Sequence, residues 1–129
     1  MREGLKAKFE YVGIRVKDLS KSIDFYTKLL EMKVVNRFKV EKTKGEIVNL
    51  QSEDGNFILE LNHYDSDSPF NTEYAVGEGL DHLAFKVEDL DKALEEAKRF
   101  GHRVVLKVKT EKGQWVYIED PNGIWIELY

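Results

Sequence analysis

One histidine and two glutamates in this chain have the residue types and positions to bind a divalent metal ion. His82 lies in an alternating segment, HLAFKV, and Glu60 and Glu127 lie in two similar segments, FILELN and GIWIELY. If the three side chains meet in one hollow, the imidazole nitrogen and carboxylate oxygens suit Zn, Ni, Co, Mn or Fe(II). Two carboxylates in a partly closed hollow also need an ion or a cationic side chain to offset their desolvation. The ordinary alternatives are salt-bridged glutamates and a hydrogen-bonded strand histidine.

The composition excludes several other kinds of site. The chain has no cysteine, which excludes disulfides, thiolate metal sites and a cysteine nucleophile. Its formal charge of -4 comes from interspersed acidic and basic residues, so no basic face for nucleic acid is expected. No segment approaches 18 apolar residues, and the first residues lack the apolar core of a signal peptide. We expect a cytoplasmic protein that binds a small molecule and has no nucleic-acid or membrane partner.

An internal repeat organises the elements that must position these residues. The segment that starts at Tyr11 matches the segment that starts at His82, at a constant offset of 71 residues (82 − 11). A second match joins EDGNFILELN, from Glu53, to EDPNGIWIELY, from Glu119, and pairs Glu60 with Glu127. Two matches in the same order predict a duplicated module.

Each copy of the repeat predicts a βαβββ module. The strands of the first copy are expected at 9–16, 34–41, 46–52 and 57–62. Those of the second copy are expected at 82–87, 103–109, 114–119 and 124–128. Asp18 and Asp89 are placed to cap a helix after the first strand of each copy, and Gly101 to end the second helix. Module one then covers 9–62, module two covers 80–129, and the polar residues 63–79 form a linker that could act as a lid.

Strand alternation assigns the candidate side chains to one face. Val12, Ile14 and Val16 must meet the helix, so Tyr11 and Arg15 point the other way. The same alternation of side chains along the strands places six more residues on this face, namely Glu60, Asn62, His82, Lys86, Trp125 and Glu127. If the sheets curl, the face lines a cup.

Several side chains on this face are candidates for roles other than metal binding. Arg15 and Lys86 could neutralise the two carboxylates or hold a substrate carboxylate. Tyr11, Asn62 and Trp125 are further candidates for contact with a substrate, although Trp125 could simply be apolar lining.

Three motifs resemble the vicinal-oxygen-chelate superfamily in its short glyoxalase I (lactoylglutathione lyase)-like form. They are DLSKSIDFY at 18–26, LDHLAFKV at 80–87 and EDPNGIWIEL at 119–128. The resemblance covers nearly the whole chain and implies an α+β fold, in which two βαβββ modules form a curved, cup-shaped mixed sheet with helices on the outer face. It also implies that Glu60, His82 and Glu127 are metal ligands and that Glu127 is the catalytic base, with Glu60 as its symmetric partner.

The first ligand position of that superfamily, ordinarily histidine, is Tyr11 in this sequence. A neutral phenol is a poor metal ligand, so three alternatives stay open. The metal could bind through the other three residues and water. His63 could replace the missing imidazole, although parity places it on the helix face. Alternatively, the cup has no metal, and Tyr11 donates a hydrogen bond to a ligand.

The resemblance implies a metal-dependent lyase or isomerase. Its substrate would be a small α-oxo or hydroxy-carbonyl (thio)ester or a hemithioacetal, converted through an enediolate. A metal-free, bleomycin-resistance-like binding protein is the alternative that Tyr11 favours. An iron-dependent ring-cleaving dioxygenase would need two histidines at the family positions, where only His82 stands. A homodimer is expected, because two chains often complete a cup in this superfamily. His102 is expected at the surface.

Overall fold

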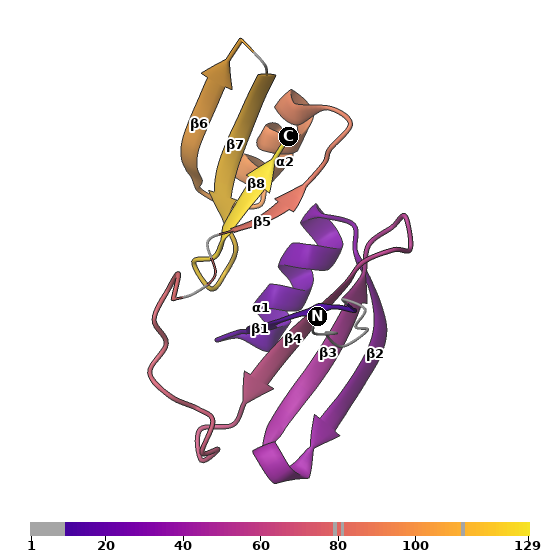
Figure 1. The fold of residues 1–129 in the computed structure, drawn as a ribbon, viewed down its shortest axis with the longest axis vertical. Helices are drawn as coiled ribbons and strands as arrows, with labels where there is room; N and C mark the ends of the chain where they lie inside the picture. Colours follow the sequence, from indigo (N-terminus) through magenta and orange to yellow (C-terminus); the bar gives the residue numbers. More distant parts are fainter. Residues whose placement is uncertain (1–9, 79, 81, 112) are drawn as a thin grey trace, which may run out of the picture.

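The structure, a computed structural model, describes residues 10–78, 80, 82–111 and 113–129 and confirms the two βαβββ modules (Figure 1). The strands of the first module are β1 (Val12–Arg15), β2 (Lys33–Val40), β3 (Gly45–Gln51) and β4 (Ile58–Tyr64). Those of the second are β5 (His82–Phe85), β6 (Val104–Thr110), β7 (Gly113–Glu119) and β8 (Trp125–Leu128). Most ends lie within two residues of the prediction. The β4 strand extends two residues into the predicted linker.

The two sheets have the same topology. The strand order is β1-β4-β3-β2 in one sheet and β5-β8-β7-β6 in the other. The first and last strand of each module pair in parallel, and the remaining neighbours pair antiparallel. Each sheet also has a register shift in its outer strand, between Val34 and Asn36 and between Val104 and Leu106. The shifts lie 70 residues apart, at equivalent points of the repeat, so they support the duplication.

Both predicted helix caps are confirmed. The amide of Lys21 donates to Asp18 Oδ1 at 2.9 Å at the start of α1 (Leu19–Asp24), and the amide of Lys92 donates to Asp89 Oδ1 at 3.1 Å at the start of α2 (Leu90–Arg99). No helix in the described residues is long and apolar enough to cross a bilayer.

The first helix departs from the regular helix that the sequence predicted. It continues after α1 as a π-helical segment, η1 (Phe25–Leu29). A π-helix has more residues per turn than an α-helix, so consecutive side chains are separated by a smaller angle around the helix axis. Phe25 and Tyr26, which are consecutive, are both buried. A short 3-10 turn, η2 (Glu41–Thr43), joins β2 to β3.

Burial confirms which face of each sheet meets its helix. On the helix face of the first sheet, Ile14, Val48 and Leu61 are buried. In the second sheet the corresponding residues are Val116, Ile118, Ile126 and Leu128. The opposite side of each sheet, which we call the open face, carries the partly exposed residues that alternate with these.

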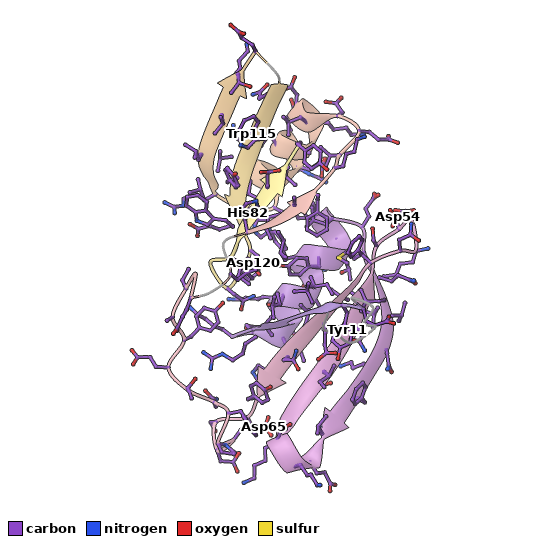
Figure 2. The ribbon with its side chains drawn as sticks, in the orientation of Figure 1. Tyr11, Asp54, Asp65, His82, Trp115 and Asp120 are labelled. Carbon is purple, nitrogen blue, oxygen red and sulfur yellow. The ribbon has the colours of Figure 1, made fainter. Side chains whose placement is uncertain are left out.

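A buried polar network joins the two modules. The loop after β7 reaches α1 and η1 of the first module, and Figure 2 shows Asp120 at this junction. The Tyr26 hydroxyl donates to Asp120 Oδ2 at 2.9 Å, and the Asn122 side-chain amide donates to Ser22 Oγ at 3.1 Å. The Lys17 amide donates to Asn122 Oδ1 at 2.6 Å. Burial, with the nearby Asp120 carboxylate, raises the pKa of the Tyr26 phenol well above its usual value, which keeps it a neutral donor.

We expect Tyr26→Phe to lower the free energy of unfolding by about 1–3 kcal/mol, because the buried Asp120 carboxylate loses a donor. Urea denaturation would measure the change. Tyr64→Phe is the matched control. The Tyr64 ring packs against Phe70 with centroids 5.7 Å apart, and among the described residues its hydroxyl makes no hydrogen bond. Equal effects of the two substitutions would contradict the role assigned to Tyr26.

Candidate functional site

His82 and Glu127 come together on the open face of the second sheet. His82 begins β5, Glu127 lies on the neighbouring β8, and His82 Nε2 is 3.7 Å from Glu127 Oε1. The hydroxyl of Tyr117, on β7, donates to the same Glu127 oxygen at 3.1 Å. The side chains of His82 and Glu127 are 34% and 19% exposed, so the pair is accessible but not fully solvated. We call His82 and Glu127 the module-two half-site.

The geometry of this half-site fits two ligands of one divalent ion. With metal–ligand bonds of about 2.1 Å, two adjacent ligand atoms lie about 3.0–3.4 Å apart. The observed separation of 3.7 Å therefore needs only a small side-chain movement. A neutral imidazole and a carboxylate are also ligands that zinc and its neighbours accept.

The corresponding place in the first sheet holds Glu60 and Tyr11. Glu60 lies on β4 beside Gly13 of β1, just as Glu127 lies beside Ala84 of β5. Tyr11 immediately precedes β1 and is 52% exposed. Asn62 is next on this face, with its Nδ2 atom 3.3 Å from the position that a Cβ on Gly13 would take. We call Tyr11 and Glu60 the module-one half-site.

The two half-sites do not merge within one chain. In residues 10–78, 80, 82–111 and 113–129, no three His, Cys, Asp or Glu side chains gather closely enough to hold a metal ion. Figure 2 shows Tyr11 and His82 on different modules, well apart in this view. Strand parity correctly assigned each residue to the open face of its own sheet. It could not tell whether the open faces of one chain meet each other.

Arg15 holds the linker. One of its terminal nitrogens donates to the carbonyl and hydroxyl oxygens of Thr72 at 3.1 and 2.8 Å, and the other donates to the Glu73 carbonyl at 3.3 Å. The Tyr74 ring lies 5.0 Å from the Arg15 guanidinium carbon and 4.6 Å from Lys17 Nζ. Between β1 and this linker is a cavity of about 290 Å³, lined in part by Gly13, Arg15 and Tyr74. Lys86, the other predicted cation, is exposed beyond the end of β5.

Two histidines lie away from both half-sites. His63 is on the helix face of β4, opposite Glu46 on β3, as parity predicted. The expectation that His102 is a plain surface residue needs correction, because its ring packs edge-on against Phe25 with centroids 4.7 Å apart. Partial burial lowers the pKa of the His102 imidazole. The loop after α2 turns this side chain toward the first module, which local sequence does not reveal.

Comparison with known proteins identifies the family. The protein-family sequence model described as the Glyoxalase/Bleomycin resistance protein/Dioxygenase superfamily matches residues 8–128 of this chain. The chain belongs to this superfamily. Within it, a lactoylglutathione lyase of Neisseria meningitidis serogroup A is 34% identical over 121 residues, covering 89% of this chain and 84% of that protein. A probable chloroplastic lactoylglutathione lyase of Arabidopsis thaliana is 33% identical over 129 residues, covering 95% of this chain but 35% of that protein.

Solved structures of superfamily members have the same architecture. The trypanothione-dependent glyoxalase I of Leishmania major superposes with a TM-score of 0.74 at 29% identity, covering 95% of this chain and 86% of that one. A glyoxalase family protein from Bacillus cereus, at 23% identity and a TM-score of 0.76, shows the fold alone. The chain spans less than half the length of the plant relatives that it matches.

The sequence analysis missed two residues that lie beside Glu60 and Glu127. Tyr117 lies directly across β7–β8 from Glu127, and Asn49 lies directly across β3–β4 from Glu60. Opposed residues on antiparallel strands are near neighbours, so correct strand registers would have revealed both. The one-residue gap in the repeat, which falls between the turn and the last strand of each module, hides those registers from the sequence.

We expect Arg15→Gln to increase amide hydrogen exchange across residues 72–78 by roughly tenfold, equivalent to about 1.4 kcal/mol, since Arg15 ties Thr72 and Glu73 to β1. Mass spectrometry of exchanged peptides would measure it. Lys86→Gln removes the other predicted cation and should leave that segment unchanged. If both variants exchange like the wild type, the three hydrogen bonds do not hold the linker.

Proposed function

We propose that this protein is a metal-dependent lyase or isomerase of the glyoxalase type, acting on a hemithioacetal or a related small hydroxycarbonyl compound. The observation that carries the proposal is the His82–Glu127 pair, with 3.7 Å between potential ligand atoms on an accessible sheet face. Its repeat-related partner, Glu60, supplies a third ligand of suitable chemistry. Relatives named lactoylglutathione lyase at about 30% identity support the same reaction class.

The chain's own residues would bind the substrate and move its proton. When bound, a divalent ion would supply Lewis-acid polarisation of neighbouring substrate oxygens. A carboxylate of Glu60 or Glu127 would take a proton from one carbon and return it to the next. Asn62 and Trp125, which lie on the same open faces, would contact the rest of the substrate.

A homodimer would complete the site by joining the module-one half-site of one copy to the module-two half-site of the other. Each half-site is short of ligands within its own chain. Each also shares its open face with large exposed apolar side chains that a second copy could cover. These include Phe38 in module one and Leu106 and Trp125 in module two. Isologous pairing forms two equivalent sites per dimer, which matches a duplicated chain.

We expect the purified wild type to bind Ni²⁺ or Zn²⁺ stoichiometrically. Tyr11→His should tighten metal binding by about tenfold or more, equivalent to about 1.4 kcal/mol, because an imidazole replaces a phenol. Elemental analysis and titration calorimetry would measure both. Tyr64→Phe again serves as the control for loss of a phenol elsewhere. Failure of the wild type to take up either metal would remove the proposed function.

Mixing Glu60→Gln with Glu127→Gln would test whether two chains share the site. Each variant alone should be nearly inactive in the conversion of the methylglyoxal–glutathione hemithioacetal to lactoylglutathione. Subunit exchange should restore about a quarter of wild-type activity, since half of the dimers are mixed and each has one intact site of two. If each chain forms its own site, mixing will restore nothing.

A metal-free binding protein is the second candidate function. Tyr11 at the first ligand position favours it, because a neutral phenol can donate a hydrogen bond but binds metal poorly. A thermal-shift screen would separate the two candidates, since a ligand that binds only the folded state raises the apparent melting temperature. A shift with small organic compounds but none with divalent ions would favour this candidate over the lyase.

A further inference from the structure

We propose that Asn122 is a deamidation site that reacts only when the two modules separate, and that the aspartate formed there prevents the modules from packing together again. Asn122 and Gly123 are the single Asn–Gly pair of the chain. In a flexible segment such a pair readily loses its side-chain amide, because glycine has no side chain to hinder attack by its own backbone nitrogen. This chemistry is independent of the proposed lyase function.

Deamidation of this pair needs only water as a co-reactant. The Gly123 backbone nitrogen attacks Asn122 Cγ, so that a new C–N bond forms and the bond from Cγ to Nδ2 breaks. The proton of the Gly123 nitrogen leaves with Nδ2 as ammonia, and a succinimide ring remains. Water then opens the ring at either of its carbonyl carbons. The product is aspartate or isoaspartate, in which the main chain runs through the former side chain.

The packed modules hold the Asn122 side chain in place. Asn122 is 1% exposed, and its Oδ1 atom accepts the Lys17 amide at 2.6 Å. Its Nδ2 atom donates to Ser22 Oγ at 3.1 Å and to Asp120 Oδ2 at 2.9 Å. Rotation of Cγ toward the next backbone nitrogen would break these bonds. Lys17 and Ser22 belong to module one, so separation of the modules would free the side chain for reaction.

The attacking nitrogen is held as well. The Gly123 amide donates to the Asp120 carbonyl oxygen at 3.0 Å, which favours the protonated and therefore unreactive nitrogen. Gly123 has a φ of +82°, and Val76 of the linker lies over it, with Cγ2 3.0 Å from the position that a Cβ on Gly123 would take. Both partners of the reaction are thus kept apart by the closed loop and by the segments packed on it.

Conversion to aspartate would reverse the effect of this side chain on the junction. An ionised carboxylate has no donor, so both hydrogen bonds that Nδ2 gives would be lost. The new charge would also meet the Asp120 carboxylate, which is only 4% exposed. Two ionised carboxylates oppose each other strongly when they are buried together. The Asp120 loop would then no longer pack on α1 and η1, and the separated state would persist.

The equivalent turn of module one provides an internal control. Asp54 and Gly55 can form the same succinimide ring by loss of water, and its hydrolysis gives isoaspartate. Asp54 is exposed, and among the described residues its side chain accepts only the Asn56 amide. Isoaspartate formation at Asp54 should therefore not depend on whether the modules are packed together.

Peptide mapping by mass spectrometry of the full-length chain, incubated at mildly alkaline pH, would measure both reactions. We expect Asn122 to deamidate about a hundredfold or more slowly in the folded wild type than in the same chain unfolded in urea. Tyr26→Phe, which weakens the junction at Asp120, should speed deamidation in the folded protein by about tenfold. Tyr64→Phe deletes a phenol hydroxyl elsewhere and should match the wild type. Asp54 should react equally fast in all three folded proteins.

Asn122→Asp and Asn122→Ala would separate the added charge from the lost hydrogen bonds. The alanine variant loses the same donors but gains no charge, so Asn122→Asp should have the lower urea midpoint of the two. Its amide hydrogens in η1 should also exchange faster. If neither variant folds, the deamidated fraction of aged wild type, isolated by anion exchange, takes their place. It should exchange faster in η1 than the unmodified fraction.

Three results would overturn parts of this proposal. Equal deamidation rates in the folded and the unfolded chain would show that the packed modules do not protect Asn122. If Tyr26→Phe deamidates no faster than Tyr64→Phe, the contact between the modules does not control the reaction. If Asn122→Asp is as stable as Asn122→Ala, the added charge does not keep the modules apart. An Asn122→Asp chain that fails to fold where Asn122→Ala folds would support the proposal.

Discussion

The buried carboxylate of Asp120 is the interaction on which the rest of the molecule depends. Its Oδ1 atom accepts the amides of Asn122 and Ile124, each at 2.8 Å, which shapes the loop before β8. Its Oδ2 atom accepts the Tyr26 hydroxyl from the first module. One side chain therefore folds its own loop and ties that loop to the other module. A buried charge is tolerated only when its oxygens are satisfied in this way.

This connection determines where the candidate site residues lie. Because the loop after β7 packs on α1 and η1, the modules meet through helices and loops, as Figure 1 shows. Their open sheet faces, which carry Glu60 on one side and His82 and Glu127 on the other, remain separate within the chain. Duplication supplied two similar half-sites. Under the proposed function, a second copy would supply the missing half.

The two copies of the repeat have also diverged. Asp54, the counterpart of Asp120, accepts only the Asn56 amide among the described residues and lies in an exposed loop. Ser22 and Tyr26, which bind the Asp120 loop, correspond to Ala93 and Ala97, which have no side-chain donors. Only one of the two possible loop-to-helix contacts can therefore form through polar groups. The same asymmetry appears at the half-sites, where Tyr11 matches His82 and Asn49 takes the place of Tyr117.

The sequence by itself determined the doubled βαβββ fold, both helix caps and the open-face positions of Glu60, His82 and Glu127. These features follow from periodicity and local hydrogen bonding, which short segments encode. Only the tertiary structure decided that Arg15 holds the linker, that Tyr117 contacts Glu127, and that Glu60 lies apart from His82. Those outcomes depend on strand register and on the packing of one module against the other. The last of them follows from contacts between the modules such as that of Tyr26 with Asp120, 94 positions apart in the chain, which no local pattern predicts.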